Sequence, residues 1–242
     1  MLSARPVDRP RGVSREDIML AGRLVLCLLG ALVFNLNSAS ALAQEASKDE
    51  LDDQVRAFLE QRQGRWRDLN IPTRDGRFLH DLIVEHGYTR ALEIGTSTGH
   101  SSIWIAWALS KTGGKLITLE IDEGRHREAL ENFEQAGLSP YIDARLGDAH
   151  ELVKQLVGPF DFVFSDADKG WNTQYFIDVA PRMVSGGCYT THNVRSRGRR
   201  RGGGGQGYVD YLMSRPDFET TVETTETSGI AVSCRKSEQP DR

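Results

Sequence analysis

The stretch of sequence that most restricts the fold spans residues 90–102 and reads RALEIGTSTGHSS. It begins with a short apolar run around Glu93, which is typical of a buried strand. Gly95 and Gly99 follow at a four-residue spacing, and the residues from Ser101 onward are suited to the start of a helix. The stretch therefore predicts a strand, a tight glycine turn and a helix, with backbone N–H groups that a ligand can approach closely.

The same alternation of apolar runs and amphipathic segments continues along the chain. It predicts strands at residues 90–94, 115–121, 141–145, 160–165, 188–192, 218–222 and 229–234. Helices are predicted at residues 99–110, 124–136, 149–157, 171–183 and 208–215. Repeated strand–helix units favour a parallel sheet with helices on both faces, and the last two strands favour an antiparallel edge. The predicted fold class is therefore α/β, with a mostly parallel seven-stranded sheet.

The first 43 residues differ in composition from the rest. Several arginines precede an apolar run at residues 24–34, and small residues follow at 39–43. This order is typical of a secretory signal peptide, so we expect an exported protein that starts near Gln44 and meets the membrane only during export. The alternatives are a retained N-terminal anchor, translation from Met19, and a cytoplasmic protein whose N-terminus is wrongly assigned.

Three further regions are predicted after this segment. A helical cap is expected at residues 44–87, with helices at 46–69 and 77–84, followed by the main domain at 88–236 and a tail at 237–242. Residues 194–207 are rich in arginine and glycine and follow the fifth strand. We expect a solvated loop there. A lid that recruits an acidic substrate and an RNA-binding segment are the alternatives.

Charge and cysteine content exclude some classes of function. The net charge of −4 disfavours a nucleic-acid partner. The three cysteines include no CxxC pair, which excludes a zinc ribbon and a dithiol redox motif. Cys188 and Cys234 fall in the last strands, where free buried thiols are the default expectation and a disulfide is expected only in an exported protein.

Ligands of such sheets bind beyond the carboxyl ends of the strands, so the residues after each strand are the candidates for function. Glu120 is placed to accept hydrogen bonds from ribose hydroxyls. Asp148 is suited either to an adenine amino group or to capping the next helix. Asp166 and Lys169 follow the fourth strand, and His192 and Asn193 follow the fifth, so the two groups should be neighbours.

The glycine turn is neither GxGxxG nor GxxxxGK[ST], but its E-x-G-x-x-x-G pattern resembles that of S-adenosylmethionine (SAM)-dependent methyltransferases with a Rossmann-like fold. Residues 71–194 resemble, more specifically, the catechol and caffeoyl-coenzyme A O-methyltransferases. The matching segments are DGRFL, LEIGTSTGHS, TLEID, FDFVFSDADKGW and HN, in that order along the chain.

The resemblance implies roles for individual residues. Those that would hold SAM are Ile71, Glu93, Gly95, Ser97, Gly99, Ser101, Glu120, Asp148, Ala149 and Asp166. Lys169 would be the general base, with Asp166 beside it as a catalytic and metal-binding carboxylate. Asn193 would be a second metal ligand.

His192 departs from the family pattern, in which an aspartate precedes the asparagine. Because Mg²⁺ prefers oxygen ligands and imidazole suits Zn²⁺, Fe²⁺ or Mn²⁺, either the metal has changed or it is absent. A site of Asp166, His192 and Asn193 is the metal-bound alternative.

The resemblance implies a SAM-dependent O-methyltransferase that acts on a small hydroxylated aromatic, and homodimerisation is a family-level expectation. The alternatives are an exported, non-catalytic SAM-fold binding module and a methyltransferase acting on a hydroxyl of a modified tRNA nucleoside.

Overall fold

The structure is a computed structural model that describes residues 46–66, 68–194, 206–224 and 229–237. The chain divides into two units, Met1–Glu50 and Leu51–Arg242. The expected signal peptide and residues 195–205 of the arginine–glycine segment lie outside the described residues. Among the described residues, no helix is both long and apolar enough to cross a membrane.

The second unit is built on one seven-stranded sheet of order β3-β2-β1-β4-β5-β7-β6. The strands are β1 (Arg90–Ile94), β2 (Lys115–Glu120), β3 (Ile142–Leu146), β4 (Phe160–Ser165), β5 (Met183–Val194), β6 (Phe218–Thr224) and β7 (Gly229–Arg235). Strands β1 to β5 pair in parallel, whereas β7 is antiparallel to both β5 and β6. The predicted α/β fold with an antiparallel edge is confirmed.

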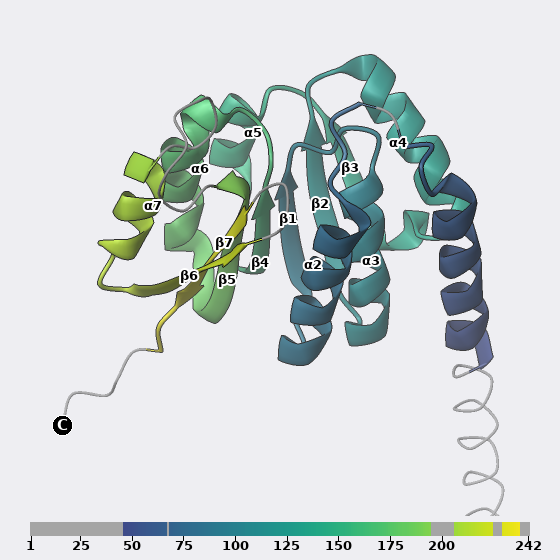
Figure 1. Ribbon diagram of the computed structural model, residues 1–242, viewed down its shortest axis with the longest axis horizontal. Helices are drawn as coiled ribbons and strands as arrows, with labels where there is room; N and C mark the ends of the chain where they lie inside the picture. Colours follow the sequence, from purple (N-terminus) through teal and green to yellow (C-terminus); the bar gives the residue numbers. More distant parts are fainter. Residues whose placement is uncertain (1–45, 67, 195–205, 225–228, 238–242) are drawn as a thin grey trace, which may run out of the picture. The chain divides into compact units, whose positions relative to one another are not determined.

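Helices cover both faces of this sheet (Figure 1). They are α2 (Thr73–His86), α3 (His100–Thr112), α4 (Glu123–Gln135), α5 (Ala149–Gln155), α6 (Asn172–Val179) and α7 (Gln206–Met213). One apolar cluster joins the sheet to α5, α6 and α7, and a second joins it to α2 and α3. A third cluster packs α3 against α4 and the helical residues 51–62. Helix α3 is buried from His100 to Ser110, which fits the apolar residues spread around all of its faces.

Two predicted helices were too long. The first helix ends at residue 62 rather than 69, because the chain turns at Gly64, whose φ is 71°. Helix α6 ends at Val179 rather than at 183, and a short 3-10 turn, Ala180–Arg182, follows it. Proline at position 181 has no N–H to continue an α-helix, and Met183 already pairs with Phe160 as the start of β5.

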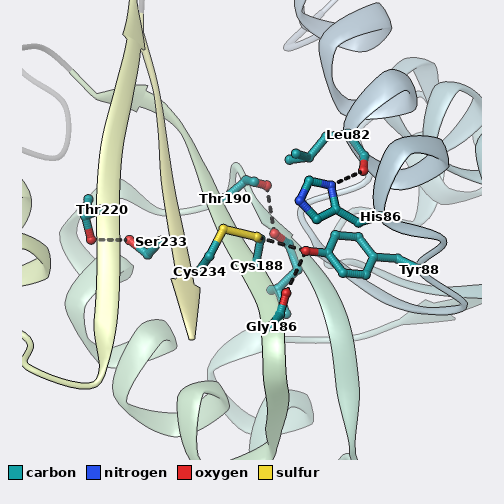
Figure 2. The surroundings of a disulfide bond; sticks show 10 residues. Leu82, His86, Tyr88, Gly186, Cys188, Thr190, Thr220, Ser233 and Cys234 are labelled. Carbon is teal, nitrogen blue, oxygen red and sulfur yellow. Dashed lines mark hydrogen bonds between the residues drawn. A yellow bond between two sulfur atoms is a disulfide. The ribbon is translucent and has the colours of Figure 1, made fainter. Parts of the chain in front are cut away.

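Cys188 and Cys234 form a disulfide, so the default expectation of free thiols is wrong (Figure 2). The two residues are directly opposite each other on β5 and β7, and their Cα atoms are 4.0 Å apart. The Tyr88 hydroxyl donates to the Gly186 carbonyl at 2.8 Å and lies 3.0 Å from the Cys188 sulfur. Antiparallel pairing across the sheet edge therefore brings together two cysteines whose contact the sequence left open.

Candidate functional site

The turn after β1 exposes backbone groups at the carboxyl edge of the sheet. Gly95 has a φ of 99°, and a Cβ there would lie 3.0 Å from the backbone nitrogen of Ala167. Ser97 also adopts a positive φ, 49°. The N–H groups of Gly95 and Thr96 donate to the Leu119 carbonyl at 3.0 and 3.1 Å, which anchors the turn to β2. The close approach of two backbones therefore requires glycine at position 95.

Gly99 is required for a different reason. It is the N-cap of α3 with a φ of 93°, and a Cβ there would lie 2.5 Å from the ring of Phe133 on α4. The sequence predicted Gly99 as a cofactor-binding residue, but its structural environment is a helix contact. The two glycines of the motif thus serve two separate packing needs.

Glu93 is fully buried in β1 and carries one unpaired oxygen. Its Oε2 accepts hydrogen bonds from the hydroxyls of Ser102 and Thr118, the latter at 2.6 Å, whereas Oε1 has no partner among the described residues. Burial raises the pKa of Glu93 to about 7, although the neighbouring hydroxyls lower it and the charge of Asp166 raises it again. A buried carboxylate with one unpaired oxygen therefore lies directly before the glycine turn.

Glu120, at the end of β2, is almost fully buried and holds the turn in place. Its Oε2 accepts from the backbone N–H of Ser97 at 2.7 Å, and its Oε1 accepts from those of Ile121 and Asp122 at 3.1 and 3.0 Å. Both acceptor positions of Oε1 are thereby taken, whereas Oε2 retains one. The predicted ribose acid therefore lies at the sheet edge and retains acceptor capacity for hydroxyl groups.

A cavity of about 330 Å³ opens at this edge. Its lining includes six of the predicted site residues, namely Gly95, Ser97, Glu120, Asp148, Ala149 and Asp166. The other lining residues were not among the predicted site residues; they are Leu69, Leu119, Ile121, Arg125, His150, Ala167, Asp168 and Tyr175. Leu69 and Ile121 are large apolar side chains left 71% and 66% exposed, which suits contact with an apolar part of a ligand. Ile121 could have been predicted as a lining residue, because it directly follows Glu120 in the sequence.

Residues that follow β3 also line the cavity. Asp148 is the N-cap of α5, and its Oδ1 accepts from the His150 N–H at 2.9 Å, so the capping alternative is confirmed. His150 stacks on Trp171 with ring centroids 3.9 Å apart. The Nε2 atom of His150 is buried without a hydrogen-bond partner among the described residues, although Oδ2 of Asp168 lies 3.7 Å away.

Asp166 and Lys169, after β4, form an ion pair. Lys169 donates to Oδ1 of Asp166, and both side chains are mostly buried. The backbone N–H of Asp166 donates to the Ile94 carbonyl at 2.9 Å, which fixes the carboxylate beside the glycine turn. The charged groups predicted at the end of β4 therefore lie together; Asp166 lines the cavity, whereas Lys169 is not among the lining residues.

His192, near the end of β5, lies between two carboxylates. Its Nδ1 is 3.1 Å from Oδ2 of Asp166, and its Nε2 is 2.9 Å from Oδ2 of Asp75 on α2. Burial lowers the pKa of His192, but the hydrogen bonds and charges of Asp166 and Asp75 outweigh this effect and raise it. Asp75 was not predicted as a site residue, and its position within the DGRFL segment of the family pattern was the only signal.

The side chains at this edge do not fit a bound divalent metal. Both oxygens of Asp166 are engaged, by Lys169 and by His192, and both ring nitrogens of His192 contact carboxylates. Asn193, which has a φ of 59°, is the remaining member of the predicted ligand set. The part of the chain that the structure describes contains no group of three His, Cys, Asp or Glu side chains placed to hold a metal ion. We therefore derive no chemical step through a metal.

Two other predicted residues act next to the cavity rather than in its lining. Ile71 is buried, and its carbonyl lies 2.9 Å from Nδ1 of His100, which ties the segment before α2 to the start of α3. Ser101 lies in the first turn of α3, where its hydroxyl interacts with Glu93. Both residues thus contact residues that flank the glycine turn, namely His100 and Glu93.

A larger cavity of about 460 Å³ lies elsewhere, with Trp104, Trp107 and His80 in its lining. None of the residues predicted for the site lines it. The smaller cavity is therefore the better candidate for the functional site, because Glu120, Asp166 and the glycine turn all line it.

The sequence places this chain in a family. Residues 42–199 match the family profile described as O-methyltransferase. The chain belongs to the O-methyltransferase family. This confirms the family that the sequence motifs indicated.

Curated members of the O-methyltransferase family match about half of this chain. A catechol O-methyltransferase of Niastella koreensis is 41% identical over 112 residues, which are 45% of this chain and 50% of that protein. A catechol O-methyltransferase of Mycobacterium tuberculosis is 35% identical over 121 residues, 50% of this chain and 54% of that protein. The chain thus spans about half the length of the curated relatives it matches.

Solved O-methyltransferase structures extend the likeness. An O-methyltransferase from Bacillus cereus in complex with SAH superposes with a TM-score of 0.65 and 28% identity, covering 76% of this chain and 91% of that one. An O-methyltransferase from Streptomyces achromogenes involved in tomaymycin synthesis, in complex with SAM, gives a TM-score of 0.64 at 28% identity, covering 75% and 88%. SAM and SAH are thus the ligands of these two structural relatives.

Proposed function

We propose that this protein transfers the methyl group of SAM to a hydroxyl of a small phenolic, catechol-like acceptor. The observation that carries the proposal is the position of Asp166, which borders the cavity beside the glycine turn and is paired with Lys169. The cavity brings together a site for a nucleoside and an acid–base pair. The catechol O-methyltransferases among the relatives support the choice of acceptor.

The cavity and its surroundings suit SAM group by group. The unpaired Oε1 of Glu93 suits the methionine ammonium, and Glu120 has acceptor capacity for the ribose. The exposed side chains of Leu69 and Ile121 suit the faces of the adenine. His150 also lines the cavity, and its buried Nε2 has no hydrogen-bond partner among the described residues.

The residues of this chain then position the acceptor and manage one proton. When bound, SAM supplies an electrophilic methyl group: the acceptor oxygen attacks the methyl carbon, the carbon–sulfur bond breaks, and its electron pair stays on sulfur to leave SAH. Lys169 accepts the hydroxyl proton on its amine nitrogen, and the resulting ammonium pairs with Asp166. Alignment of the two reactants is worth roughly 7–11 kcal/mol of the barrier.

The direct test measures SAM binding and methyl transfer together. We expect calorimetry to show binding of SAM and SAH, and radiolabelled methyl transfer from SAM to catechol or caffeate. Lys169→Ala should lower kcat by about 100-fold or more and change the dissociation constant of SAM by less than about 3-fold. Binding without transfer to any hydroxylated aromatic would instead indicate a non-catalytic binding module.

Lys154→Ala is the matched control. Lys154 is also a lysine paired with an acid three positions away, Glu151, but both side chains are exposed on α5. Its loss should change neither kcat nor the affinity for SAM. An equal effect of the two substitutions would contradict the role of Lys169.

The role of Glu120 is tested by affinity alone. Glu120→Gln replaces a charged acceptor of three backbone N–H groups and of the proposed ribose hydroxyls. The loss of charge-assisted hydrogen bonds is expected to weaken SAM binding by about 10- to 100-fold. Unchanged affinity in calorimetry would remove the proposed ribose contact.

We also propose that the protein is exported to an oxidising compartment. The Cys188–Cys234 disulfide supports this, because such bonds persist mainly outside the reducing cytosol. N-terminal sequencing of the protein from its host should find a start near Gln44, and thiol labelling should find these two cysteines blocked until reduction. An intact N-terminus with both thiols free would contradict export.

A further inference from the structure

Three carboxylate and imidazole groups form a continuous buried chain at the carboxyl edge of the sheet. Asp75 of α2 contacts Nε2 of His192 at 2.9 Å, and Nδ1 of His192 contacts Asp166 at 3.1 Å. Asp75 is 1% exposed and His192 is 4% exposed. The far oxygen of Asp166 accepts from Lys169, so the chain ends on a cation beside the cavity.

The hydrogen bonds among Asp75, His192 and Asp166 indicate the charge of the His192 ring. An ionised carboxylate only accepts hydrogen bonds, and a neutral imidazole has one N–H to donate. Because both ring nitrogens of His192 face carboxylates, both contacts are satisfied when the ring carries two N–H groups and a positive charge. Asp166 is then flanked by two cations, and the four side chains balance in charge without a metal.

The same contacts engage both oxygens of Asp166 and one oxygen of Asp75, whose Oδ1 has no hydrogen-bond partner among the described residues. A hard cation needs several oxygen ligands, and the oxygens of Asp166 already accept from Lys169 and His192. The ring of His192 fills the space between Asp75 and Asp166, with a carboxylate at each end. One ring nitrogen of His192 would have to lose its contact with Asp75 or Asp166 before it could bind a metal ion.

We propose that His192, held by Asp75, takes over the place of a divalent metal beside Asp166, so that methyl transfer proceeds without a metal ion. The inference rests on the proposed function for its catalytic part. Asp75 and His192 are positioning residues, because they act through Asp166 and line no wall of the cavity. Asp75 fixes the ring, the ring fixes the Asp166 carboxylate, and Asp166 in turn orients Lys169 toward the acceptor.

Metal binding tests the inference without any activity measurement. Wild-type protein is dialysed against a chelator and titrated with Mn²⁺, and free Mn²⁺ is followed by electron paramagnetic resonance. We expect no stoichiometric binding up to about 1 mM by the wild type. His192→Asp should bind Mn²⁺ at least 10-fold more tightly, because it adds a carboxylate between Asp166 and Asn193 and removes the imidazole.

His86→Asp is the matched control for the added charge. His86 lies at the other end of α2 and contacts only the Leu82 carbonyl and the ring of Tyr88 among the described residues. It should leave Mn²⁺ binding as in the wild type. Stoichiometric micromolar binding of Mn²⁺ by the wild type, or loss of activity on chelation with recovery on Mg²⁺ addition, would overturn the inference.

The positioning role of Asp75 has its own readout. In ¹⁵N spectra of the histidine rings at pH 7, the wild type should show two protonated nitrogens for His192, and Asp75→Asn should shift the ring toward the neutral form. The same substitution should lower kcat by about 10-fold or more, with the KM for SAM changed less than 3-fold, and Asp75→Glu should recover part of both. An unshifted ring would overturn the role of Asp75.

Asp81→Asn is the comparison for that substitution. Asp81 is also on α2 and pairs with a histidine, His80, at 2.8 Å, but its side chain is 66% exposed. It should alter neither the His192 signals nor kcat.

If the wild type neither transfers methyl groups nor binds Mn²⁺, the proposed function fails while the metal-free cluster stands.

Discussion

Asp75 on α2 and His192 on β5 meet through Oδ2 and Nε2 atoms 2.9 Å apart, although 117 positions separate them in the chain. This contact fastens a helix that precedes the sheet to the edge where the candidate site lies. Its partners are almost completely buried, so neither can exchange its partner for water. The stability of the fold and the geometry of the site therefore depend on the same pair.

The loss of Asp75 should destabilise the fold. Asp75→Ala leaves His192 without one of its two carboxylate partners in a buried setting, and breaking such a pair costs roughly 3 kcal/mol. Urea unfolding should show this loss in the free energy of unfolding. Asp81→Ala on the same helix removes an exposed partner and should cost less than about 1 kcal/mol. Similar losses for both variants would contradict the structural importance of the buried pair.

The pKa values of two buried histidines should be shifted in opposite directions. Burial lowers the pKa of His100 to about 4, despite its contact with the Ile71 carbonyl, whereas the carboxylates around His192 raise its pKa above 6.5. His100 should therefore reduce stability as pH falls from about 6.5 to 4, since the unfolded chain binds that proton first. The contribution of His192 is complete below about 6.5 and is lost as pH rises through its folded pKa. NMR titration of the two ring protons checks both signs, and a common midpoint would contradict them.

Glu93→Gln should separate stability from binding. Because the pKa of Glu93 is raised from 4.5 to about 7, its ionised form is disfavoured in the folded protein, by roughly 3 kcal/mol at pH 8. This cost is absent below pH 4.5 and grows as pH rises to 7. The variant should therefore raise the Tm at pH 8 more than at pH 5, and it should weaken SAM binding at pH 8. A pH-independent Tm difference would contradict the buried charge.

Gly76→Ala tests the contact between α2 and α3. A Cβ at Gly76 would lie 2.2 Å from the Trp104 ring, so overpacking of about 1–3 kcal/mol should exceed the gain of about 1 kcal/mol in helix propensity. Gly207→Ala is the control, because Gly207 lies in α7 and no described residue comes within 4 Å of its Cβ position. It should stabilise by about 0.5–1 kcal/mol. Thermal unfolding of the two variants should show shifts of opposite sign.

The disulfide should contribute measurably to stability. Cys188 and Cys234 are 46 positions apart, and closing a loop of that length stabilises by about 4 kcal/mol in the chain-entropy estimate. Replacing both residues with serine should lower the free energy of unfolding by about 2–4 kcal/mol. The wild type in reducing buffer should lose a similar amount. No change on reduction would indicate that the thiols are free in the isolated protein.

Much of the fold was predictable because its signals are local. The apolar runs identified all seven strands, and the absence of a helix between the last two indicated the antiparallel edge. The ends of two helices were not predictable in the same way. Gly64 and the pairing of Met183 with Phe160 end them, and the second cause is a contact between segments that are distant in sequence.

The candidate site was predictable where it follows the ends of strands. Glu120, Asp148 and Asp166 line the cavity because parallel strands present their carboxyl ends at one edge. Leu69 was missed because it does not follow a strand. His150 was missed because its position depends on stacking against Trp171, which belongs to another loop.

The sequence by itself determined the parallel sheet, the glycine turn and the acids that follow each strand, because these depend on residue patterns within a few positions. Only the tertiary structure decided that Asp75 meets His192, that Cys188 meets Cys234, and that both oxygens of Asp166 are already engaged by other side chains. The physical reason is that each of these contacts joins residues on separate elements, and the packing of whole helices and strands fixes which side chains come within hydrogen-bonding distance.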